Sequence, residues 1–213
     1  MVFVNSMSDL FQDAVPDGYI TAVAEVMLRT DWHTYQILTK RAERLHHLLT
    51  TKLKAAAKAS HIWWGVSVED CKYGVPRIAH LQRTPAAVRF LSIEPLLEDL
   101  GSLDLGGIHW VIVGGESGSG ARRMDPQWVR NIHAQCIKAE VPFFFKQWGG
   151  VQKSKFGRSL NGRTYDEMPG RELVAMPSRE KRHTLLRALA PLVGNPLLVQ
   201  LRTAGQSERL AHA

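Results

Sequence analysis

The chain has 213 residues, 45% of them hydrophobic, which is enough for one sizeable soluble domain with a core and a short appendage. No apolar run approaches the about 20 residues of a membrane span, and no signal peptide precedes the first strand, so a cytoplasmic protein without membrane contact is expected. Cys71 and Cys136 are too few for a disulfide framework or an all-cysteine metal site. The net charge of +7 favours polyanionic partners.

The N-terminal half alternates strands with helices. A strand over residues 2–4 is followed by a helix over 19–29, and a β-branched, aromatic strand over 34–39 comes next. Thr39 can cap a helix that starts near Arg41 and carries leucines at helical spacing. The leucines of that face are Leu45, Leu48, Leu49 and Leu53.

The pattern continues with a third strand over 62–68, a helix over 73–82 and a fourth strand over 88–93. Residues 96–107 contain no clear helical pattern and are expected to form a loop. The fifth strand, over 110–113, is a continuous apolar run of the kind that is buried on both faces of a sheet. Beyond its glycine-rich loop, Asp125 and Pro126 form an N-cap and a first helical position, which predicts a helix over 128–139.

A sixth strand is predicted over 142–150, after which the pattern changes. Residues 153–171 are expected to form a long polar loop. Ser178 can cap an amphipathic helix that Pro191, Gly194 and Pro196 break, and the last residues are expected to be disordered. We therefore divide the chain into a domain over 1–170 and a basic C-terminal extension over 171–213.

Strands that alternate with helices at this spacing predict parallel βαβ units in an α/β fold. Because a complete TIM barrel needs eight units and six strands are found, the fold class is a partial (β/α) barrel with a C-terminal helical tail. A chain that lacks N-terminal units and an open, doubly wound sheet are the alternatives. The strand at the very N-terminus favours a truncation or an alternative start, and its open edge predicts self-association.

The glycine-rich loop after the fifth strand allows two interpretations. Four glycines, Glu116 and two arginines lie between a buried strand and a helix start, where backbone amides and the helix dipole can face a bound anion. Alternatively, the segment is a tight βα turn that needs glycine only for its backbone angles.

The ends of the strands carry the best evidence for a functional site. One after another, the six strands end on polar residues: Asn5, Thr39 with Lys40, Glu69, Glu94, Glu116 and Lys146. In parallel α/β folds these ends form one mouth, where substrates bind. Alternatively, Glu and Lys pair there in a structural network, since burying them unpaired is unfavourable.

Six motifs resemble a phage and prophage family that is named after phage gene products thirty-seven and sixty-eight and has no established function. They are VFVNSMSDLF (residues 2–11), QILTKR (36–41), GVSVE (65–69), FLSIEPL (90–96), VIVGGESG (111–118) and FFKQWG (144–149). Residues 162–169 also resemble that family's closing segment, so the likeness runs from residue 2 to about 169. Residues after 171 lie outside it.

Members of that family look like radical S-adenosylmethionine (SAM) barrels, with a three-cysteine loop before the Val-Phe-Val-Asn strand that would hold an iron–sulfur cluster. That loop is not present here, so the resemblance implies the fold and SAM as a cofactor, without a cluster in this chain. By loose correspondence with glycine-plus-acid sequences that contact SAM, it assigns four residues to cofactor binding: Gly114, Gly115, Glu116 and Ser117. Polar pocket contacts are assigned to Asn5, Lys40, Glu69, Glu94 and Lys146, and the catalytic residues stay unknown.

Two other functions are open at this point. Glu69, Glu94 and Glu116 have the oxygen ligands that Mg²⁺ or Mn²⁺ prefer, so a metal-dependent hydrolase or nuclease is one alternative, although no recognised metal-ligand spacing is present. The other is a non-catalytic module that binds nucleic acid or a partner. Its basic tail, residues 171–213, contributes +4 to the net charge and would contact phosphates.

Overall fold

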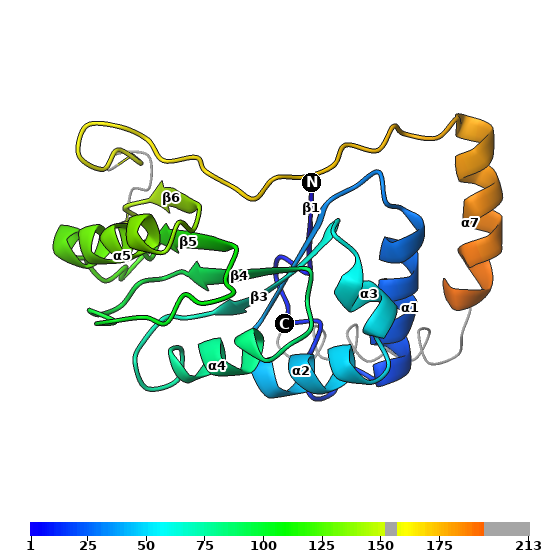
Figure 1. Ribbon diagram of the computed structural model, residues 1–213, viewed down its shortest axis with the longest axis horizontal. Coiled ribbons are helices and arrows are strands. Elements are labelled where there is room, and N and C mark those ends of the chain that lie inside the picture. Colours follow the sequence, from blue (N-terminus) through cyan, green and yellow to red (C-terminus); the bar gives the residue numbers. More distant parts are fainter. Residues whose placement is uncertain (152–156, 194–213) are drawn as a thin grey trace.

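The computed structural model of the protein describes residues 1–151 and 157–193. Six parallel strands form one curled sheet in the order β1-β2-β3-β4-β5-β6 (Figure 1). The strands are β1 (Val2–Val4), β2 (Tyr35–Thr39), β3 (Ile62–Ser67), β4 (Val88–Ile93), β5 (Trp110–Gly114) and β6 (Phe143–Gln147). A doubly wound sheet reverses its strand order part-way, whereas this order follows the sequence throughout. The partial (β/α) barrel is therefore confirmed.

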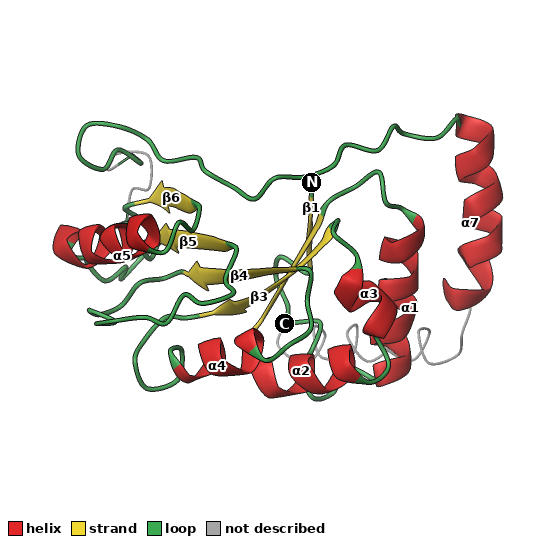
Figure 2. Ribbon diagram, in the orientation of Figure 1, coloured by secondary structure: helices red, strands yellow, loops and turns green. Residues whose placement is uncertain are grey.

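The helices are α1 (Asp17–Arg29), α2 (Ala42–Thr50), α3 (Lys54–Lys58), α4 (Pro76–Gln82), α5 (Pro126–Lys138) and α7 (Arg179–Val193) (Figure 2). Helix α2 packs against both α3 and α4, and α1 packs against α3 and α7. None of the helices in the described residues has the length and apolar character needed to cross a membrane.

Most predicted elements match within three residues, and two helices differ for local reasons. The predicted helix from Arg41 onward is split into α2 and α3 after Thr50. There, the hydroxyls of Thr50 and Thr51 donate to the carbonyls of His46 and His47 and compete with the helical ladder. Helix α4 begins at residue 76 because the preceding residues form a turn on the Asp70 carboxylate.

In the C-terminal part of the chain, the predicted helix cap at Ser178 is confirmed and one predicted helix break is wrong. Ser178 Oγ accepts a hydrogen bond from the Lys181 amide, 3.3 Å away, as expected of a helix cap. The expected break at Pro191 is wrong, because α7 continues through this residue to Val193. Pro191 lies two residues before Val193, so its missing N–H and its ring affect the last described turn of the helix. Gly194, Pro196 and the expected disordered end lie outside the described residues.

Residues 157–169 close the outer edge of β6. The Phe145 amide donates to the Tyr165 carbonyl over 3.0 Å, and the Phe143 amide donates to Glu167 Oε2 over 3.0 Å. Trp110 Nε1 donates to the Glu167 carbonyl over 2.7 Å. The described part of the predicted loop contains no helix or regular strand, as expected, yet its backbone replaces the strand partner that β6 would otherwise lack.

The two faces of the sheet are packed differently. The face toward the helices belongs to the main core, and the concave face carries a smaller cluster of Trp63, Val88, Phe90, Trp110 and Ile112. Gly65 makes this cluster possible, because a Cβ at Gly65 would lie 2.4 Å from the Phe90 ring. Large rings therefore fill the middle of the concave side.

Strand β1 has one open edge. It pairs with β2 alone, and no segment among the described residues pairs with its other edge. Val2 and Phe3 are 39% and 44% exposed, so an apolar strand with free backbone groups faces outward. Such an edge is a template for pairing with another chain.

We expect the wild-type chain to self-associate with rising concentration, and Val2→Lys to weaken this association because a charge on an edge strand opposes pairing. Size-exclusion chromatography with light scattering measures the effect. Val174→Lys is the matched control, because Val174 is 45% exposed and lies outside the sheet. A wild-type chain that stays monomeric at every concentration would contradict the prediction.

Candidate functional site

The sequence-predicted site residues lie along one edge of the sheet. All strands run parallel, so the residues directly after each strand lie at its carboxyl edge. Asn5 follows β1, Lys40 follows β2, and the three glutamates and Lys146 occupy the ends of β3 to β6. The structure thus brings the six residues to one side of the molecule. Five of them fall into three separate groups, whereas the Asn5 side chain donates to Ser8 Oγ and belongs to none of these groups.

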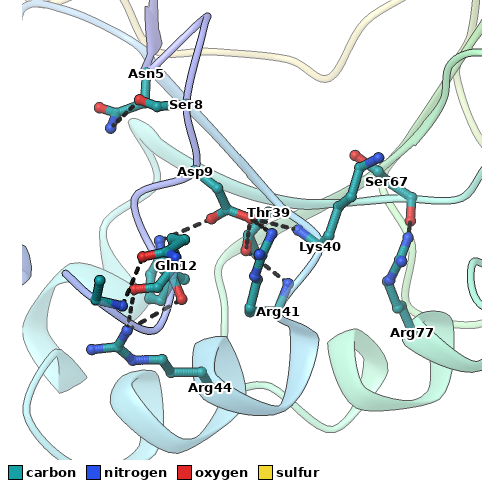
Figure 3. A network of polar contacts seen from close by, with 12 residues as sticks. Asn5, Ser8, Asp9, Gln12, Thr39, Lys40, Arg41, Arg44, Ser67 and Arg77 are labelled. Carbon is teal, nitrogen blue, oxygen red and sulfur yellow. Dashed lines mark hydrogen bonds and ion pairs between the residues drawn. The ribbon is translucent and has the colours of Figure 1, made fainter. Parts of the chain in front are cut away.

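The first group is built around Glu69, whose side chain is only 8% exposed. Its Oε2 accepts a hydrogen bond from Arg77 Nη1 over 2.7 Å, and its Oε1 makes an ion pair with Lys40 Nζ without a further hydrogen bond. Arg77 Nη1 also donates to the Ser67 carbonyl (Figure 3). Burial raises the pKa of Glu69, but Lys40 and Arg77 outweigh burial, so the net shift of its pKa is downward.

This first group carries a surplus positive charge, because two cations face one carboxylate. Arg77 is largely buried, whereas the side chain of Lys40 is 54% exposed. The Lys40 side chain is therefore paired with the buried Glu69 carboxylate and is at the same time accessible to solvent.

The second group is the pair of Glu94, directly after β4, and Lys146, on β6, which lie on either side of β5. Lys146 Nζ is 3.1 Å from Glu94 Oε1 and donates to Oε2 over 3.3 Å. Gly114 on β5 lies between them, and a Cβ there would be 2.4 Å from Glu94 Oε1. The glycine thus lets an ion pair reach across a strand, which explains why glycine ends β5.

The third group is Glu116 with Arg122, in the glycine-rich loop. The Glu116 carboxylate accepts hydrogen bonds from the Arg122 backbone amide and from Nε and Nη2, at 2.8 to 2.9 Å. These bonds lower the pKa of Glu116 to about 2. At the start of α5, the Asp125 carboxylate accepts from the Gln127 amide over 2.7 Å, as the predicted N-cap. Backbone amides that could have bound an external anion are thus bonded to the carboxylates of Glu116 and Asp125. This favours the interpretation of the glycine-rich loop as a tight βα turn.

The other residues assigned to cofactor binding are held by contacts with the end of β6. A Cβ at Gly115 would lie 1.9 Å from the Trp148 carbonyl oxygen, so only glycine fits this close approach. Ser117 Oγ accepts a hydrogen bond from Gln147 Nε2 over 2.7 Å. The loop is therefore fastened to the end of β6, and its role as a cofactor contact stays a prediction.

Asp9 is a site residue that the sequence reasoning missed. Its Oδ2 accepts hydrogen bonds from Thr39 Oγ1 at 2.9 Å, the Lys40 amide at 3.0 Å and Arg41 Nη1 at 3.1 Å (Figure 3). Its Oδ1 accepts from the Phe11 amide. One carboxylate thereby ties the loop after β1 to the end of β2 and fixes the backbone that carries Lys40. The only sequence signal was an Asp in a loop that follows a strand.

A cavity of about 400 Å³ opens between the ends of β1, β2 and β3. Phe3 and Leu38 form its apolar part, and most of the remaining lining is polar. The polar side chains include Asn5, Asp9, Thr39, Lys40, Arg41 and Ser67. We call this space the rim cavity. Its volume lies in the range of small-molecule sites, about 300–1,000 Å³.

The carboxylates and cysteines in the described part of the chain do not form a set of ligands that fits a metal ion or an iron–sulfur cluster. Glu69, Glu94 and Glu116 each pair with their own cations, and residues 1–151 and 157–193 contain no group of three His, Cys, Asp or Glu side chains that could hold a metal ion. Cys71 is exposed, whereas Cys136 is buried on α5 with its pKa raised to about 12. An iron–sulfur cluster needs thiolates, which these two cysteines do not supply together. The three carboxylates at this edge are therefore described by the alternative in which they pair with cations in a structural network.

Comparison with protein families agrees with the extent of the recognised motifs. A family profile described as "Protein of unknown function (DUF5131)" matches residues 1–169. The chain belongs to this family. The match spans all six strands, whereas α7 lies beyond it. Neither the curated proteins nor the solved structures compared with the chain gave a match.

We expect Asp9→Asn to lower the free energy of unfolding by about 1.5–3 kcal/mol, because it removes a charged acceptor from several hydrogen bonds without changing the side chain's shape. Urea denaturation followed by circular dichroism measures this. Asp13→Asn is the control, because Asp13 is exposed and lies a few residues further along. Equal destabilisation by both variants would show that Asp9 has no special role.

We expect the Glu116 carboxyl to titrate near pH 2 in the wild-type protein and toward 4.5 in Arg122→Gln. Because folding lowers this pKa, the stability contributed by the pair is complete above about pH 4.5 and is lost as the pH falls toward about 2. Carbon-detected NMR of the side-chain carboxyl follows the titration. A wild-type value near 4.5 would exclude a persistent pair in solution.

Proposed function

We propose that this protein is a ligand-binding barrel of the radical-SAM-like class and that its rim cavity binds SAM. The observation that carries the proposal is the composition of that cavity at the carboxyl edge of β1 to β3. An apolar part formed by Phe3 and Leu38 lies next to a polar part that includes Asn5 and Lys40. The motifs shared with the phage and prophage family are further support for this class of protein and for a phage-type origin.

Three groups of SAM have partners in this cavity, and its ammonium and sulfonium cations have one acid in the lining, Asp9. Its flat adenine ring suits the 44% exposed Phe3 side chain, its hydroxyls suit an amide such as that of Asn5, and its carboxylate suits the ammonium group of Lys40. Lys40 is held by the buried Glu69 and shares that carboxylate with Arg77, so positive charge is left over for an anionic group. A lysine held in this way loses less conformational entropy when a ligand binds.

The proposal is restricted to binding. Reductive cleavage of SAM needs an electron from an iron–sulfur centre, and the two thiols of this chain do not fit one. What the residues of the chain can do is hold and orient the ligand at the edge of the sheet. The alternative of a metal-dependent hydrolase has no supporting observation, because each of its three carboxylates is paired with a separate cation of the protein.

The test is isothermal titration of the full chain with SAM. We expect binding, and we expect Lys40→Met to weaken it at least about tenfold, the equivalent of about 1.4 kcal/mol. Asn5→Gly is a second variant, because Asn5 has a positive φ of 60°, which glycine also adopts without strain. Lys138→Met, at the end of α5, is the matched control and should bind like the wild type.

Circular dichroism confirms that each variant is folded. Absence of SAM binding at about 1 mM by the folded wild-type chain would refute the proposal, since this marks an affinity of only about 4 kcal/mol. Equal affinities of the wild type, Lys40→Met and Asn5→Gly would place SAM elsewhere on the molecule and refute the role of the rim cavity.

A further inference from the structure

A second and larger cavity lies at the other end of the carboxyl edge. It has a volume of about 690 Å³ and is formed by residues 121–126, Trp128 at the start of α5, and residues 148–150 after β6. It shares no lining residue with the rim cavity. None of the residues assigned to a site from the sequence lines it. We call it the tryptophan cavity.

Two indoles form part of its wall. Trp128 and Trp148 are each partly buried against the main core and partly open. Trp148 is fixed by its ring contact with Phe145, with centroids 4.7 Å apart, and by a 2.8 Å hydrogen bond from Nε1 to the Ser159 carbonyl. Open faces of fixed aromatic side chains are surfaces on which planar rings, including nucleobases, stack.

Arg123 is the cation of this cavity that is left for a ligand, because Arg122 is already paired with Glu116. Arg122 and Arg123 line it together with a single acid, Asp125. Arg123 is exposed and makes no hydrogen bond or ion pair with any residue in the described ranges 1–151 and 157–193. Its guanidinium is therefore available for an anion, and guanidinium groups suit phosphate because they donate several hydrogen bonds in one plane.

Asp125 supplies a different kind of group. Its Oδ1 accepts from the Gln127 amide, and its Oδ2 accepts no hydrogen bond from a residue in the described part of the chain. A carboxylate oxygen repels a phosphate but accepts a hydrogen bond from a sugar hydroxyl. The cavity thus combines stacking surfaces, a hydroxyl acceptor and a free guanidinium, which are the three partners that a base, a ribose and a phosphate require.

We propose that the tryptophan cavity binds a nucleoside monophosphate, with its base on the indoles, its ribose near Asp125 and its phosphate at Arg123. The volume of about 690 Å³ is within the range of small-molecule sites. The N-terminus of α5 is already capped by Asp125, so the phosphate is held by Arg123 and not by the helix end. This site is independent of the SAM binding proposed for the rim cavity.

Titration of the full chain with adenosine monophosphate, adenosine and inorganic phosphate tests the proposal, read by calorimetry and by tryptophan fluorescence. We expect the monophosphate to bind at least about tenfold more tightly than either of the other two. Arg123→Gln should weaken the monophosphate about tenfold and leave adenosine unchanged, whereas Trp128→Leu should weaken both. Arg130→Gln, an exposed arginine on α5 that does not line the cavity, is the matched control.

Three results would overturn the proposal. They are no binding of the monophosphate by the folded wild type at about 1 mM, equal binding by Arg123→Gln, and phosphate binding as tight as that of the monophosphate. Lys40→Met separates this site from the rim cavity, because it should keep the monophosphate and lose SAM. Loss of the monophosphate in Lys40→Met would instead place it in the rim cavity, and either proposal can fail alone.

Discussion

The buried carboxylate of Glu69 is the constraint on which the carboxyl edge depends. A charge that is 8% exposed persists only with good partners, and Glu69 obtains them from β2 through Lys40 and from α4 through Arg77. Its backbone carbonyl accepts a further bond from the Leu97 amide beyond β4. One residue thus fixes the relative positions of β2, β3, α4 and the segment after β4.

Two glycines decide what the concave face can hold. Gly65 admits the Phe90 ring at the middle of the sheet, and Gly114 admits the Glu94 carboxylate at its edge. Aromatic rings fill the centre of that face, and none of the five buried residues of that cluster lines either cavity. The rim cavity lies at the β1 to β3 end, and the tryptophan cavity lies near β5 and β6.

The charges of the edge favour binding the anionic groups of ligands over binding metals. Each of the three predicted carboxylates is paired with its own cation, and Glu69 is paired with two. The carboxylates therefore do not cancel all the positive charge of the edge, and ammonium or guanidinium groups stay exposed. Lys40, Lys146 and Arg123 are the cations directed outward at this edge. Carboxylates that are satisfied within the protein have little capacity left for Mg²⁺.

The sequence by itself determined the parallel α/β plan, because apolar runs and helical spacing in strict alternation permit few other folds, and polar strand ends in such a fold meet at one edge. It also fixed the cap at Asp125, whose side chain acts on its own neighbours. Only the tertiary structure decided that Asp9 holds the end of β2, that Arg77 completes the Glu69 group and that Arg122 occupies Glu116. The splitting of the helix at Thr50 and the two tryptophans on one cavity were likewise not predicted. Most of these partners are distant in sequence or on other elements, so local spacing contains no signal for them.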